Sequence, residues 1–108
     1  MEHYNERTIS VTREKRMYGC ANDYWIIIDE ERYAKLSCGK TVEIKLDSNI
    51  HKMYIAPCDE PHIKSNRIII PADEIDHRYF LVLKLHFFRD GELILSEMQH
   101  NKNQTDDF

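Results

Sequence analysis

The fold is decided by residues 41–47, TVEIKLD, in which three apolar side chains alternate with polar ones. Side chains along a strand point alternately to its two faces, so this pattern predicts a strand with one buried and one solvated face. Other segments alternate similarly or are rich in the β-branched and aromatic residues that favour strands: 8–12, 24–29, 51–56, 67–70, 78–88 and 92–98. We therefore expect an all-β fold, a single small antiparallel β-sandwich or partly open barrel of about seven strands, with at most one short helical turn at residues 72–77.

The 108 residues form one expected domain, because domains commonly hold about 100–150 residues and no linker or repeat interrupts the chain. We expect an ordered core over about residues 7–98 and a polar C-terminal tail over residues 99–108. The dipeptide Asp90-Gly91 is a strong hairpin signal and predicts the turn between the last two strands.

Three strand segments are apolar on both faces, namely residues 25–28, 68–70 and 80–83. A thin sandwich covers only one face of each strand, so the second face needs another cover. Either the loop at residues 57–66 or a second protein surface supplies it, which predicts a homo-oligomer or a protein partner. The interface candidates are Trp25, Ile27, Ile69, Phe80, Val82 and Phe88.

Two clusters contain the side chains that bind metals. One holds Cys58 and His62, and the other holds Asp73, Asp76 and His77. An extended strand at residues 67–70, rising about 3.3 Å per residue, would keep the two clusters roughly 10 Å or more apart. A zinc site needs three or four ligands that converge on the ion, so either cluster would need further ligands from elsewhere in the chain. The sequence therefore predicts solvated acidic loops and no cofactor, with a metal site as the alternative.

The cysteines Cys20, Cys38 and Cys58 are an odd set without a Cys-x-x-Cys pair, which is typical of a reduced protein. Cys38, beside Gly39 in an expected turn, is the best candidate for an exposed thiol. The N-terminal residues do not resemble a signal peptide, and no apolar run is long enough for a membrane span. We therefore expect a cytoplasmic protein without a membrane span.

A basic stretch contains Arg7, Arg13, Lys15 and Arg16. On a first strand such residues favour protective charges along an exposed edge. The alternative is a single-stranded nucleic-acid binder, since cations and nearby tyrosines can follow a phosphate backbone and stack bases. The formal net charge of −4 argues against nucleic acid as a partner.

The order of features over residues 24–56 carries a family resemblance. It runs IIID at 26–29, YAKL at 33–36, CGK at 38–40, VEIKL at 42–46 and HKMYI at 51–55. This order resembles the PEGA-type and related small β-sandwich domains of bacterial surface or lipoprotein-like proteins, although Glu30 stands where those domains have Gly. The resemblance implies a β-sandwich accessory or binding module with no catalytic residues to carry over.

The sequence thus predicts a non-enzymatic interaction module that acts through association with itself or with a protein partner. Two alternatives stay open. One is a metal-assisted hydrolase or small-ligand-binding protein that uses the His and carboxylate loops around His62 or His77. The other is a single-stranded nucleic-acid binder that uses the basic N-terminal strand.

Overall fold

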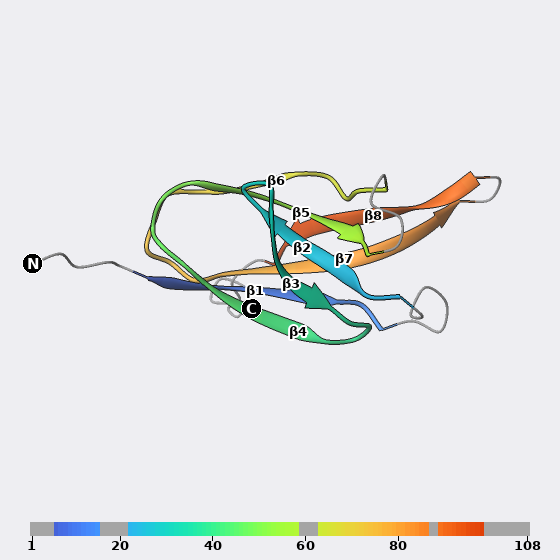
Figure 1. The fold of residues 1–108 in the computed structure, drawn as a ribbon, viewed down its shortest axis with the longest axis horizontal. Coiled ribbons are helices and arrows are strands. Elements are labelled where there is room, and N and C mark those ends of the chain that lie inside the picture. Colours follow the sequence, from blue (N-terminus) through green and yellow to red (C-terminus); the bar gives the residue numbers. More distant parts are fainter. Residues whose placement is uncertain (1–5, 16–21, 59–62, 87–88, 99–108) are drawn as a thin grey trace, which may run out of the picture.

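Two four-stranded β-sheets pack against one another in the computed structural model, which describes residues 6–15, 22–58, 63–86 and 89–98 (Figure 1). The strands are β1 (Arg7–Arg13), β2 (Tyr24–Ile28), β3 (Glu31–Leu36), β4 (Thr41–Leu46), β5 (His51–Pro57), β6 (Ile68–Ile70), β7 (His77–His86) and β8 (Arg89–Glu97). No helix occurs in these ranges, and residues 72–75 form bends rather than the expected helical turn. The predicted all-β sandwich is confirmed, with β3 as an additional strand.

One sheet has the order β4-β1-β7-β8 and the other has the order β3-β2-β5-β6. Every neighbouring pair is antiparallel except β1 and β7, which run parallel. The prediction that β1 is an exposed edge is therefore wrong, because β1 lies between β4 and β7. All four strands of the opposite sheet lie between β1 and β7 in the chain, so this parallel pair joins segments that are distant in sequence.

The alternation pattern does not predict strand β3, because its sequence is highly polar and only Leu36 is buried. The chain enters it through a two-residue turn in which Asp29 and Glu30 have φ angles of 54° and 67°. Positive φ at both central residues is typical of the type I′ turn, which matches the twist of the flanking strands. Neither residue is glycine, so the usual sequence signal of this hairpin is missing.

The turn predicted at Asp90-Gly91 is also displaced. Strand β8 already begins at Arg89, which pairs with His86, and the register shifts between Lys84 and His86. Two residues of β8 therefore face one residue of β7, as in a β-bulge. The glycine belongs to this bulge, so the prediction that Asp90-Gly91 forms the turn itself is wrong.

The core lies between the inner faces of the two sheets. Its largest apolar contributors with less than 2% exposure are Ile9, Val11, Ile26, Ile28, Leu36, Met53, Ile55, Ile70, Tyr79, Leu81 and Leu95. The decisive segment at residues 41–47 behaves as predicted, because β4 buries Ile44 and Leu46 and exposes Glu43 and Lys45. Alternation along each strand sends the remaining apolar side chains to the two outer faces.

The loop at residues 57–66 is predicted to cover an outer face. Its described residues, 57–58 and 63–66, lie along one side of the sandwich. Ser65 continues the pairing along β5: its N–H donates to the Ile55 carbonyl at 2.8 Å, and its hydroxyl accepts from the Ile55 N–H at 2.9 Å. The Asn66 amide exchanges two 2.8 Å hydrogen bonds with the backbone of Leu95 in β8. This segment therefore ties the two sheets together along their shared edge.

Candidate functional site

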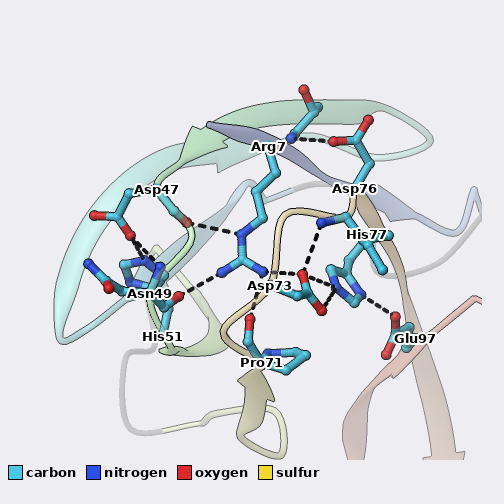
Figure 2. A network of polar contacts seen from close by, with 11 residues as sticks. Arg7, Asp47, Asn49, His51, Pro71, Asp73, Asp76, His77 and Glu97 are labelled. Carbon is cyan, nitrogen blue, oxygen red and sulfur yellow. Dashed lines mark hydrogen bonds and ion pairs between the residues drawn. The ribbon is translucent and has the colours of Figure 1, made fainter. Parts of the chain in front are cut away.

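Arg7 lies at the centre of a polar network where the β4–β5 turn meets the segment between β6 and β7 (Figure 2). Its guanidinium donates to the carbonyls of Asp47 at 3.0 Å, Asn49 at 2.6 Å and Pro71 at 2.6 Å, and to the Asp73 carboxylate at 2.7 Å. Only 2% of Arg7 is exposed. A buried guanidinium needs such partners because an unpaired buried charge is costly.

Two histidines are each held between two carboxylates beside this arginine. His77 Nδ1 lies 2.5 Å from Glu97 Oε2, and His77 Nε2 lies 3.1 Å from both Asp73 oxygens. His51 is placed in the same way between Asp29 and Asp47. Ionised carboxylates only accept hydrogen bonds, so both ring nitrogens are best satisfied when the imidazole carries two protons.

This geometry shifts the pKa of both histidines and of three aspartates, Asp29, Asp47 and Asp73. Burial disfavours the charged form of both histidines, but the carboxylate hydrogen bonds outweigh it and raise the pKa of His51 and of His77. Hydrogen bonds with His51 lower the pKa of Asp29 and of Asp47. Desolvation opposes ionisation of Asp73, yet hydrogen bonds from Ile75, His77 and Arg7 hold its pKa below the usual value.

We expect the free energy of unfolding to fall as pH rises above about 6.5. The histidine contribution is fully present below the unfolded pKa and is lost as pH passes through the raised folded values. The aspartate contribution is present above about pH 4 and is lost as pH falls through the lowered folded pKa values. Urea unfolding across this range should therefore show a mildly acidic optimum.

The double variant His51→Gln/His77→Gln is the control for this pH dependence. It removes both titrating imidazoles, so the decline in stability above about pH 6.5 should flatten. An equally steep decline in this variant would contradict the assignment.

The residues proposed as metal ligands do not assemble into a site. Asp73 and His77 do meet, but Asp73 is already paired with the buried Arg7 cation, which disfavours a second cation there. Asp76 instead accepts a hydrogen bond from the Thr8 N–H at 2.7 Å. Cys58 follows β5 in the other sheet, and His62 lies outside the described residues. Across the described ranges, no three His, Cys, Asp or Glu side chains converge to hold a metal ion.

The basic stretch of β1 is likewise used inside the protein. Arg13, 4% exposed, donates to the carbonyls of Asn22 at 2.9 Å and Leu36 at 3.0 Å, and its Cζ lies 3.8 Å from the centroid of the Tyr24 ring. Arg7 is buried in the network described above, and Arg16 lies outside the described residues. The two arginines that would follow a phosphate backbone are therefore inaccessible to it.

The outer face of the sheet β3-β2-β5-β6 contains a hollow. This hollow of about 230 Å³ is lined by Trp25, Ile27, Glu30, Arg32, Tyr54, Ala56, Pro57, Cys58 and Lys64. Trp25 lies opposite Ala56, and Ile27 lies opposite Tyr54, on neighbouring strands. We call the outward side chains of Trp25, Ile27, Tyr54, Ala56 and Ile69 the Trp25 face. Ile69 is 51% exposed.

Cations lie over both aromatic rings of the Trp25 face. Arg32 Cζ and Lys35 Nζ are 5.2 Å and 5.4 Å from the centroid of the Trp25 ring. Lys64 Nζ and Arg67 Cζ are 5.2 Å and 4.6 Å from the centroid of the Tyr54 ring. Such cation–π contacts contribute about 0.5–1 kcal/mol at exposed sites, so they orient the side chains without neutralising their charge.

The predicted interface candidates divide between the two sheets. Trp25, Ile27 and Ile69 belong to the Trp25 face, whereas Phe80 and Val82 are half-buried on the outer face of β7. Phe88 lies outside the described residues. The structure therefore brings three of the six together and places two of the others on the opposite side of the sandwich.

The cysteines contradict two predictions, namely that the set is reduced and that Cys38 is an exposed thiol. Cys38 is disulfide-bonded, so the expectation of an exposed thiol there is wrong. Cys58 is a free, half-buried thiol at the rim of the hollow. Cys20 lies outside the described residues. Three cysteines can form one disulfide and leave one free thiol. The odd count and the lack of a Cys-x-x-Cys pair do not exclude this arrangement.

Sequence reasoning missed the four cations around Trp25 and Tyr54. Lys35 faces Trp25 across the β2–β3 hairpin, so recognising that hairpin would have revealed one of them. Lys64 and Arg67 reach Tyr54 from a loop, for which no short-range pattern exists.

Among the described residues, no segment forms a helix of the length and apolarity that a membrane crossing needs. No protein-family model, no curated protein and no solved structure matches this chain.

Proposed function

We propose that this protein is a non-enzymatic binding module that engages a protein partner through the Trp25 face. The observation that supports this most is the hollow beside Trp25 and Tyr54, on an open sheet face, with cations above both rings. Aromatic and arginine side chains are enriched where interfaces gain most of their affinity. A β-sandwich accessory module, as implied by the resemblance at residues 24–56, fits the same function.

A protein side chain fits this hollow better than a cofactor does. Small-molecule sites usually enclose about 300–1,000 Å³ and surround most of their ligand. The volume of about 230 Å³ lies below that range. Its lining also comes largely from a sheet face, which is the kind of surface that a second protein covers.

The partner is a different chain rather than a second copy paired through the same face. A two-fold dimer brings identical surfaces together. The Trp25 face would then place Arg32, Lys35, Lys64 and Arg67 against their own copies, and like charges facing each other oppose association. Self-association, the other route that the sequence predicted, would have to use another surface such as Phe80 and Val82.

The metal-assisted and nucleic-acid alternatives receive less support. Asp73 and His77, advanced for acid–base or metal chemistry, are bonded to Arg7, to Glu97 and to each other. Arg7 and Arg13, advanced for nucleic-acid binding, are buried. Both groups of residues stabilise the sandwich, and neither lines the hollow.

The disulfide at Cys38 favours a placement outside a reducing cytoplasm. Disulfides persist mainly in oxidising compartments. This supports the surface-protein placement implied by the resemblance over the cytoplasmic placement expected from the cysteine count.

Selection of random displayed peptides on the immobilised protein tests the proposed function. We expect peptides to be enriched, and we expect Ile27→Ser to weaken their binding by about tenfold or more in fluorescence anisotropy, because it removes apolar surface from the hollow. The matched control is Ile94→Ser, since Ile94 is also half-buried and faces outward, but on β8 of the opposite sheet. Failure to enrich any peptide, or equal losses in both variants, would remove the Trp25 face as the binding surface.

A further inference from the structure

We propose that the partner segment held by the Trp25 face is an acidic peptide, whose carboxylates meet Arg32, Lys35 and Lys64 while an apolar side chain enters the hollow. This inference rests on the proposed function and specifies the chemistry of the partner.

Among the described residues, the charges around the hollow are mainly positive. Four cations lie over the two rings, and Glu30 is the one described carboxylate in the lining. Glu30 is already engaged, since its Oε2 lies 2.8 Å from Arg67 Nη1 and its Oε1 accepts from the Tyr54 hydroxyl at 3.3 Å. The surface therefore offers positive charge beyond what its own carboxylate neutralises.

Three of the four cations keep their charge available. Within the described part of the chain, Arg67 has an ion pair with Glu30, whereas Arg32, Lys35 and Lys64 have none. A protein whose formal charge is −4 thus keeps three cations without ion-pair partners around one hollow. Charge complementarity selects a partner with negative groups at matching positions.

The rings argue for carboxylates rather than nucleobases. Binding of single strands depends on aromatic faces that are open to stack bases. Here guanidinium and ammonium groups lie over Trp25 and Tyr54 within 5.4 Å of the ring centroids. A carboxylate can approach these cations from outside without displacing them, whereas a stacked base would have to push them aside.

Charge alone does not define the partner, because apolar side chains also line the hollow. The half-buried side chains of Trp25 and Ile27 and the buried Ala56 line the hollow between the cations. A volume of about 230 Å³ is ample for one large side chain, since a water molecule occupies about 30 Å³ of liquid. An acidic segment containing a leucine or an aromatic residue matches both features.

The test uses the peptides enriched by display, together with a synthetic copy of the strongest binder in which every Asp and Glu is replaced by its amide. We expect the enriched sequences to be rich in Asp and Glu, and the amide copy to bind about tenfold or more weakly in fluorescence anisotropy. We also expect Lys35→Glu/Lys64→Glu to weaken binding of the acidic peptide by a similar factor.

The matched control is Lys45→Glu/Lys84→Glu, which reverses two exposed lysines on the opposite sheet and should change the affinity by about twofold or less. All four positions are exposed, so both proteins should fold, which urea unfolding checks. Neutral peptides that bind and are lost in Ile27→Ser would overturn the acidic partner while leaving the proposed function intact. Tighter, lysine-dependent binding of single-stranded oligothymidylate would overturn it in favour of a nucleic acid.

Discussion

Replacing Arg7 with methionine should lower the free energy of unfolding by about 3–5 kcal/mol, the usual cost of breaking a buried ion pair by removing one partner. Methionine keeps an unbranched apolar chain of similar length, so the change isolates the guanidinium. Three backbone carbonyls and the Asp73 carboxylate would each lose a hydrogen-bond donor. Since small domains are stable by only about 5–15 kcal/mol, this variant should be close to unfolding at 37 °C.

The reason for so large an effect is the position of Arg7 in the chain. It joins the β4–β5 turn to the segment before β7, and its partners lie 40 to 66 residues away in sequence. The two sheets meet at these segments, so the guanidinium fixes several connections at once. Figure 2 shows how the carbonyls and the Asp73 carboxylate surround it.

Arg78→Met is the matched control, because Arg78 is exposed and points away from the core on β7. It should change the free energy of unfolding by no more than about 0.5 kcal/mol. Urea unfolding followed by circular dichroism measures both variants. Comparable stability of Arg7→Met and Arg78→Met would contradict the role assigned to the Arg7 network.

Reduction of the protein should lower the free energy of unfolding by about 2–4 kcal/mol, which is typical for the loss of a native disulfide. The bond at Cys38 lies directly after β3, where the chain turns towards β4. Losing it enlarges the conformational freedom of the unfolded chain. Guanidinium chloride unfolding with and without dithiothreitol measures the effect.

Two serine variants make this result specific. Cys38→Ser should match the reduced wild-type protein and should not respond further to dithiothreitol. Cys58→Ser removes the free thiol and should keep the full response of the wild-type protein. If dithiothreitol leaves the unfolding curve of the wild-type protein unchanged, the disulfide does not contribute to stability.

The fold class followed from local patterns because alternation is a local property. Residues 41–47 bury Ile44 and Leu46 as their spacing predicts, and Ile26 and Ile28 do so on β2. The pairing of β1 with β7 was not predictable in this way, since it joins segments about 68 residues apart. Short-range patterns give strands, but the partner of a strand depends on the whole core.

The arginines show a second limit of local reasoning. An arginine in a strand is usually exposed, so the sequence alone predicts Arg7 and Arg13 at an exposed edge. Their burial is possible only because backbone carbonyls from distant segments accept their hydrogen bonds. Nothing within a few residues of either arginine indicates those acceptors.

The apolar residues of the candidate site could be predicted from the sequence, but its cations could not. Trp25 and Ile27 are predicted as interface residues because their strand is apolar on both faces, and both residues line the hollow. The surrounding cations come from β3 and from the loop that precedes β6. They lie close together only once the sheet has formed. Sequence therefore identified the apolar floor of the site, whereas the fold was needed to reveal its charge.

The most direct test of the central claim is the affinity of one enriched peptide for Ile27→Ser compared with its affinity for Ile94→Ser. Both changes remove an outward isoleucine from a strand, but only Ile27 lines the hollow. Binding through the Trp25 face predicts a loss of about tenfold or more for Ile27→Ser and little loss for Ile94→Ser. Equal affinities of the two folded variants would contradict the claim.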